Sequence, residues 1–252
     1  MKKIYTYLAY FWQYIKYGDF KSIYYSIYFL LTQKSNAEAR LVKSGLGSFY
    51  TRANTLDFQY INYAYELGVK KFIEQSDFDV YIDAGACVGE FSVWLAKEGK
   101  KCIAFEPVKN SYELILKNTA LNNVESKVQV LNYGLGNKHA VEYFLVDHLN
   151  MGASKKVDYI TDEKFEINRL DDVFEGFNLK KSDRILVKID VEGMEIDLLE
   201  GARNFLNYFD EVILIIEEKL SGEGEIKSYI SKNHNFEFGL VDHFNMYART
   251  KK

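Results

Sequence analysis

The chain is poor in proline and cysteine. Pro107 is its single proline, and Cys87 and Cys102 are its two cysteines. Two cysteines are too few for a disulfide framework, and their spacing does not fit a zinc site. We therefore expect two reduced thiols in a cytoplasmic protein. The apolar segment Ile23–Leu31 is also far shorter than the roughly 20 residues that a membrane span needs.

The chain also lacks an excess of basic over acidic residues. The formal net charge is −4, and this argues against a nucleic-acid partner because phosphate binding needs a dense cationic face. Hydrophobic residues make up 48% of the 252 positions and charged residues 27%, which is typical of a globular protein with a sizeable core. We therefore expect a folded protein whose partners do not include nucleic acid.

Residues 1–36 form an aromatic-rich extension. The patterns Ile4–Tyr17 and Asp19–Leu31 predict two helices separated by Gly18. Two lysines ahead of an apolar run would suit a signal peptide, but no small-residue cleavage site follows. Two placements stay open for the helices. They pack on the rest of the protein or on a second subunit of a homo-oligomer, or they lie on a membrane surface as a peripheral anchor.

The rest of the chain divides into a lead-in, residues 37–75, and a core, residues 76–252. The lead-in predicts short strands and turns around Gly45 and Gly47, then one helix over Leu56–Glu74. In the core, apolar runs alternate with helical patterns at Glu90–Glu98, Asn110–Leu121 and Ala202–Tyr208. The expected strands are Phe78–Ile82, Cys102–Phe105, Val128–Leu131, Ile185–Ile189, Val212–Ile216, Phe236–Leu240 and Phe244–Ala248. This predicts an α/β domain with a mostly parallel seven-stranded sheet, ending in an antiparallel hairpin.

A glycine-bearing turn follows the first core strand. Asp83, Gly85, Ala86 and Gly89 stand between that strand and a helix. The glycines allow a tight turn and a close approach of a ligand. The spacing differs from the dinucleotide fingerprint G-x-G-x-x-G, and a carboxylate at the strand end would repel a pyrophosphate. A zwitterionic amino acid that carries a sulfonium group suits this turn better.

Glu106 and Pro107 end the second core strand, 23 residues beyond Asp83. An acid at this place can accept hydrogen bonds from both hydroxyls of a ribose. The structural alternative is a carboxylate that stabilises the first turn of the following helix. Together with the glycine turn, Glu106 predicts a ligand that contains adenosine.

Acidic side chains gather where the fourth and fifth core strands end. Lys188 and Asp190 are two residues apart, so they face the same way and can pair. Asp190 is our candidate for the general base of a hydroxyl-directed reaction, or for the group that orients the hydroxyl. Glu217 and Glu218 could form an acidic pocket with Asp190 that holds Mg²⁺. Glu192 lies at the same strand end as Asp190, beside the expected cofactor. A purely structural ion pair between Lys188 and Asp190 is the alternative.

Three blocks together resemble the FkbM family of methyltransferases over about residues 50–220. They are Asp83-x-Gly85-Ala86-x-x-Gly89, Phe105-Glu106-Pro107, and Lys188-Ile189-Asp190-Val191-Glu192-Gly193-x-Glu195. The resemblance implies a Rossmann-like class I methyltransferase fold, S-adenosylmethionine as cofactor, and O-methylation of a sugar in a small molecule or glycan. The third block contains our candidate catalytic residues, Lys188, Asp190 and Glu192. The family usually has asparagine where this chain has Cys87.

Two further segments match positions of the same family. Arg52, Thr55 and Asp57 could contact the cofactor or bind the substrate, and Glu217 could also bind the substrate. For the first three, the alternative is a helix N-cap at Thr55 beside a surface salt bridge. Arg169–Asp172 is interpreted as a helix start with Asp171 as its cap.

Two other functions stay open. One is a nucleotide-dependent oxidoreductase on the same fold, and the other is a non-catalytic scaffold that binds S-adenosylmethionine. Among the histidines, His148 lies in an irregular stretch, residues 147–154, that we expect to cover the site, and His243 lies in the last hairpin turn. Either could replace Asp190 as the base.

Overall fold

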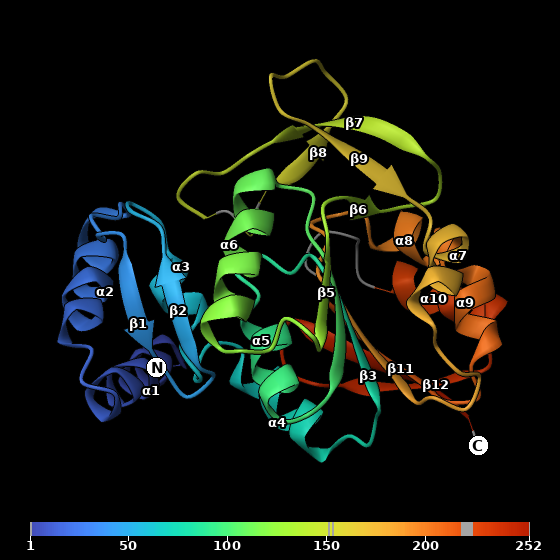
Figure 1. Ribbon diagram of the computed structural model, residues 1–252, viewed down its shortest axis with the longest axis horizontal. Coiled ribbons are helices and arrows are strands. Elements are labelled where there is room, and N and C mark those ends of the chain that lie inside the picture. The colour runs from blue at the N-terminus through green and yellow to red at the C-terminus, as the bar shows by residue number, and fades with distance from the viewer. Residues whose placement is uncertain (1, 151, 153, 218–223, 252) are drawn as a thin grey trace.

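The computed structural model describes residues 2–150, 152, 154–217 and 224–251. Its centre is a seven-stranded sheet with helices on both sides (Figure 1). The N-terminal segment forms a separate end of the molecule, and a smaller four-stranded sheet lies across the top in the same view. The expected α/β architecture is confirmed.

The central sheet has the order β12-β13-β11-β10-β3-β4-β5. Neighbouring strands are parallel from β11 through β5, and β13 runs antiparallel to both of its neighbours. The strands are β3 (Val80–Ala84), β4 (Lys101–Phe105), β5 (Val128–Leu131), β10 (Ile185–Ile189), β11 (Val212–Glu217), β12 (Phe236–Leu240) and β13 (Asn245–Thr250). All seven expected strands are present, including the antiparallel pair at the end.

Alternate residues of the inner strands serve two cores, because successive side chains of a strand point to opposite faces. Tyr81 and Leu186 belong to the core under α4, α5 and α6, whereas Ile82 and Val187 belong to the core under α8, α9 and α10. These helices are α4 (Leu67–Gln75), α5 (Glu90–Lys97), α6 (Lys109–Leu121), α8 (Glu195–Gly201), α9 (Arg203–Tyr208) and α10 (Glu225–Asn233). Burial on both faces explains why these strands are continuous apolar runs.

The irregular stretch 139–168 contributes three strands to the smaller sheet, whose order is β6-β9-β7-β8. Its strands are β6 (Gly134–Leu135), β7 (Ala140–Leu145), β8 (Lys155–Val157) and β9 (Lys164–Asn168). A short helix, α7 (Leu170–Val173), and a 3₁₀ turn (Phe174–Phe177) lead from it back to β10. Phe144 and Ile167 of this sheet reach the loops at the carboxyl ends of the central strands.

The extension forms two helices, α1 (Lys2–Lys16) and α2 (Phe20–Thr32), as expected. The Tyr14 hydroxyl donates to the Phe58 carbonyl at 3.1 Å, and the Asn62 side chain donates to the Tyr10 carbonyl at 3.2 Å. Both helices therefore pack on the lead-in. Among the described residues, no helix is both long and apolar enough to cross a bilayer.

The lead-in corrects one prediction. A hairpin of β1 (Arg40–Lys43) and β2 (Ser48–Thr51) forms as expected, but the single helix over Leu56–Glu74 is wrong. The segment forms α3 (Asp57–Tyr60) and α4, separated by turns. The Asn62 side-chain oxygen accepts a hydrogen bond from the Ala64 amide, and Glu66 has a left-handed backbone with φ of +47°. Side-chain bonding to the nearby backbone competes with helix, which is why the chain breaks here.

Candidate functional site

A pocket lies at the carboxyl ends of β3, β4, β10 and β11 and under the smaller sheet. It encloses about 1110 Å³ of empty space, part of which is open to solvent. The glycine turn, Glu106 and the segment Lys188–Glu192 all contribute to its wall. Open α/β sheets bind their ligands at this edge, so the three sequence motifs converge on one site.

The two glycines of the first turn have different roles. Gly85 lies in the pocket wall with φ of +89°, and a Cβ atom there would lie 2.0 Å from the Asp190 carbonyl oxygen. The Asp190 amide also donates to the Ala84 carbonyl at 3.1 Å. Gly89, at φ of +77°, faces Ile115 of α6 and is not part of the wall. Gly85 thus makes room for the backbone that follows β10 and also borders the pocket, whereas Gly89 makes room for a helix side chain. A close approach of the ligand to Gly85 stays a prediction, and Gly89 is not placed for one in this structure.

Gly85→Ala is therefore expected to lower the free energy of unfolding by roughly 4 kcal/mol or more, since left-handed strain is added to a backbone collision. Gly99→Ala is the matched control. Gly99 has φ of +94° but no atom within 4 Å of the added Cβ, so it should lose only about 1–2 kcal/mol from strain. Urea unfolding of both variants measures the difference. Equal losses would contradict the close contact between Gly85 and the Asp190 carbonyl.

Glu106 connects the turn that follows β3 with the turn that follows β4. Its carboxylate accepts hydrogen bonds from the Cys87 amide at 2.8 Å and from the Val108 amide at 2.9 Å. Burial raises the pKa of Glu106 to about 7, although both amide bonds lower it. Cys87 itself has a left-handed backbone with φ of +51°. Asparagine tolerates that conformation better than cysteine does, which gives a conformational reason for the family's usual residue.

Lys188 is buried at the centre of a group of carboxylates. Its Nζ lies 2.8 Å from Asp190 Oδ2 and 3.8 Å from Glu66 Oε2, and it lies 5.3 Å from the centre of the Phe91 ring. Burial alone would lower the pKa of Lys188, but Asp190, Glu66 and Asp83 together raise it well above its ordinary value. The pairing of Lys188 with Asp190 is thus present as the two-residue spacing predicted.

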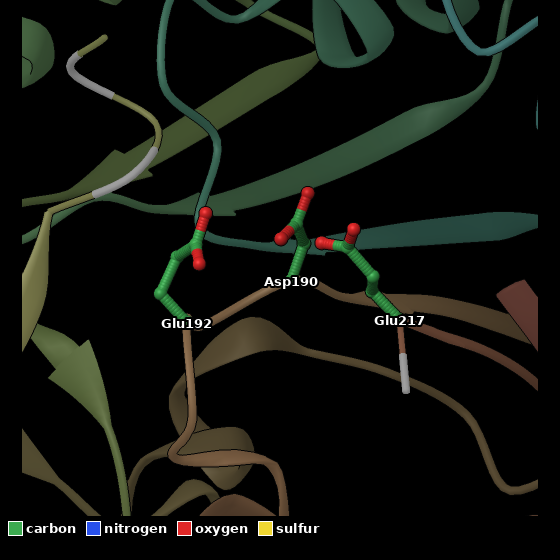
Figure 2. A group of neighbouring side chains, drawn as sticks. All are labelled: Asp190, Glu192 and Glu217. Carbon is green, nitrogen blue, oxygen red and sulfur yellow. The ribbon is translucent and has the colours of Figure 1, made fainter. Parts of the chain in front are cut away.

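Asp190, Glu192 and Glu217 direct their carboxylates toward the same region (Figure 2). Each offers an oxygen, and these oxygens lie within 4.8 Å of one another. Glu192 has a left-handed backbone with φ of +50° and is followed by Gly193 at +99°. That turn brings Glu192 back beside the strand end. Glu218, which we expected in this pocket, lies outside the described residues, and the structure places Glu192 beside Asp190 and Glu217.

The structure adds charged groups that the sequence did not single out. These are Glu66 and Glu90, which line the same pocket. Asp83, which the sequence did indicate, is buried beside them and accepts hydrogen bonds from Ser92 at 2.8 Å and from Tyr81 at 3.2 Å. Burial raises the pKa of Glu90 to about 8, and burial lowers the pKa of nearby Lys70 to about 8. Glu90 directly follows Gly89, so its place at a helix start could have marked it. No sequence pattern marked Glu66 as a pocket residue, because it reaches the pocket only through the break between α3 and α4.

Arg52, Thr55 and Asp57 are not in the pocket wall. Arg52 forms a two-pronged ion pair with Asp57, at 2.9 and 2.8 Å, and donates to Ser111 at 2.9 Å. Asp57 is buried, so the pair is not the surface salt bridge of the alternative interpretation. Their role in substrate binding stays a prediction.

Asp171 also differs from its expected role as the cap of its own helix. Arg169 is the N-cap residue of α7, and Asp171 lies in the first turn. The Asp171 carboxylate accepts from the Phe205 amide at 2.8 Å, in the first turn of α9. It therefore caps a neighbouring helix.

The loop 147–154 borders the pocket through Asn150, Gly152 and Ser154. The Tyr60 hydroxyl donates to the Asn150 side chain, and the Leu56 amide donates to the Leu149 carbonyl at 3.0 Å. The expected cover is thus attached to α3. His148 and His243 are exposed and are not part of the wall, so neither is placed to act as the base in this structure.

Comparison with known proteins gives a consistent result. Residues 83–243 match the domain described as the methyltransferase FkbM domain. Methyltransferase sdnD of Sordaria araneosa is 29% identical over 154 residues, which cover 48% of this chain and 59% of that protein. Methyltransferase 1 of Beauveria bassiana is 26% identical over 168 residues, which cover 57% of this chain and 66% of that protein. The matches therefore span somewhat less than two thirds of these relatives.

A solved structure from Streptococcus agalactiae, a protein in the NADB-Rossmann superfamily, aligns with a TM-score of 0.46 and 16% identity. The alignment covers 72% of this chain and 66% of that one. The FkbM domain match includes the glycine turn, Glu106 and the whole Lys188–Glu195 block. The chain belongs to the FkbM family of methyltransferases.

Proposed function

We propose that this protein transfers the methyl group of S-adenosylmethionine to a hydroxyl group of a sugar. One observation carries the proposal: a single pocket contains the glycine turn, the carboxylate Glu106, and the pair Lys188–Asp190. The residues expected to bind the cofactor and the residues expected to act on the acceptor thus lie in one cavity, as methyl transfer between two bound molecules requires.

The pocket residues fit this cofactor. Glu106 would hold the ribose hydroxyls, since each of its oxygens accepts one amide bond and keeps capacity for another. Among the described residues, none hydrogen-bonds Glu90 Oε2, a buried carboxylate oxygen in the wall. A buried acceptor without a partner suits a donor such as an ammonium group. A dinucleotide would instead bring its phosphates close to these carboxylates, which disfavours the oxidoreductase.

S-adenosylmethionine supplies a methyl group on a sulfonium, which an oxygen nucleophile can accept. In this proposal the Asp190 carboxylate orients the acceptor hydroxyl and takes its proton. Lys188 fixes Asp190 in place through the 2.8 Å contact and balances its charge in the buried end of the pocket. Glu192 and Glu217 accept hydrogen bonds from further hydroxyls of the acceptor.

Two features support a sugar as the acceptor. The carboxylates of Asp190, Glu192 and Glu217 form an acceptor-rich wall that suits neighbouring hydroxyls. Tyr60, Tyr65 and Phe144 supply aromatic surface in the same pocket, on which a pyranose ring can pack. The family resemblance points the same way.

Magnesium at the carboxylate cluster stays a prediction. Oxygen ligands from carboxylates are what Mg²⁺ prefers, and three carboxylates within 4.8 Å of one another could share one ion. Activity measured with EDTA and then with added Mg²⁺ tests it.

Binding and label transfer test the proposed function. Calorimetry should show binding of S-adenosylmethionine and no comparable binding of NADH. Glu106→Gln should weaken cofactor binding at least about tenfold, because a charged acceptor to the ribose is lost. Methyl-labelled cofactor should then transfer its label to nucleotide sugars or polysaccharides. Tight binding of NADH alone would refute the proposal, and cofactor binding without transfer to a broad hydroxyl panel would favour the scaffold.

A further inference from the structure

The two N-terminal helices each leave an apolar stripe uncovered. On α1 the exposed side chains Tyr5, Leu8, Trp12 and Ile15 recur at helical spacing, and on α2 so do Phe20, Tyr24, Ile27 and Leu31. Trp12 is 66% exposed and Leu31 80%. Large uncovered apolar surfaces of this kind mark interaction sites in folded proteins.

These stripes are not an unfinished core, because the helices already use their other faces for packing. Tyr10, Tyr14 and Tyr25 are buried together with Phe58 of α3. Asp19, between the helices, accepts from the Ser22 hydroxyl at 2.6 Å and pairs with Arg40 at 2.7 Å. The helix pair is therefore fixed to the protein, and its outer stripes face away from that core.

The charge of this segment differs from that of the whole chain. Residues 1–34 contain five lysines and one acidic residue, Asp19, whereas the chain as a whole has a net charge of −4. Asp19 is buried and paired with Arg40, so the helix pair itself presents lysines and no acidic side chain on its outer surface. One of these lysines, Lys21, pairs with Glu38 at 2.6 Å. Lys16 and Lys34 are exposed at the ends of the helices.

We propose that α1 and α2 dock this protein on the surface of an anionic lipid bilayer. Apolar and aromatic side chains with flanking lysines match the two parts of such a surface, the acyl boundary and the negative headgroups. A symmetric dimer through the same patch would bring two lysine-bearing surfaces together, which like charges oppose. The docking does not depend on the proposed methyl transfer.

Vesicle binding of the full chain tests the docking. The protein has two tryptophans, and Trp94 is buried at 7% exposure, so an emission shift reports on Trp12. Trp12 emission should shift to the blue with vesicles of phosphatidylcholine and phosphatidylserine, and much less with phosphatidylcholine alone. Lys16→Gln and Lys34→Gln should each weaken binding roughly fivefold. Leu8→Ser with Leu31→Ser should weaken it more than about tenfold.

The matched control is Ile160→Ser with Leu240→Ser, which removes two apolar side chains outside the helix pair that are at least about as exposed, at 82% and 79%, as Leu8 at 56% and Leu31 at 80%. It should bind vesicles as the wild type does. Wild-type protein that does not bind anionic vesicles would overturn the proposal. So would light scattering that shows a dimer dispersed by the Leu8 and Leu31 substitutions, since the stripes would then join two copies.

Discussion

Asp190→Asn is expected to bind S-adenosylmethionine within about threefold of the wild type and to lose roughly 10²- to 10⁴-fold in kcat. The asparagine side chain keeps the shape of the site but cannot take a proton. The fold should tolerate the change, because Lys188 keeps Glu66 at 3.8 Å as a partner. Calorimetry with the cofactor and single-turnover label transfer measure the two effects separately.

Glu192→Gln and Glu217→Gln are the matched controls, since both alter a carboxylate of the same cluster. We expect them to raise KM for the acceptor and to lower kcat less than about tenfold. Full activity in Asp190→Asn would remove Asp190 from proton transfer. Similar losses in all three variants, reversed by added Mg²⁺, would instead assign the cluster to a metal ion.

The sequence was sufficient to predict the central sheet and the position of its site. Strands buried on both faces are apolar throughout, so Ile185–Ile189 is predicted with its observed bounds. The pairing of Lys188 and Asp190 follows from the two-residue period of a strand. Glu106 lines the pocket because parallel strands end at the same edge.

The parts that sequence patterns missed depend on contacts between distant segments. Glu66 reaches the pocket only because the helix is interrupted after α3. There the Asn62 side chain accepts a hydrogen bond from the Ala64 amide and donates one to the Tyr10 carbonyl. Gly85 is explained by the Asp190 carbonyl, which directly follows another strand, β10. Neither the break nor the close approach has a local period by which it could be recognised.

Lys188→Met is expected to lower the free energy of unfolding by about 3–5 kcal/mol. Methionine fills a similar volume but leaves Asp190, Glu66 and Asp83 in a buried region without their shared cation. Lys188 now lowers the pKa of both Glu66 and Asp83 against the effect of burial. Urea unfolding near pH 8, where all three are ionised in the unfolded chain, measures the loss. A loss below about 1 kcal/mol would mean that the lysine is not needed to balance these charges.

The pH dependence of that loss distinguishes charge from packing. Burial already raises the pKa values of Glu66 and Asp83 in the folded protein above those in the unfolded chain, and without Lys188 they rise further because its positive charge no longer opposes burial. The folded variant then binds protons more tightly, so it gains stability as the pH falls through these values. The deficit should therefore shrink between about pH 8 and pH 5, whereas a packing defect would persist. Lys188→Met combined with Asp190→Asn should recover part of the loss at pH 8, because one unpaired charge is removed with its partner. Additive losses would show that the two side chains do not interact, and would remove the basis for assigning Lys188 a positioning role toward Asp190.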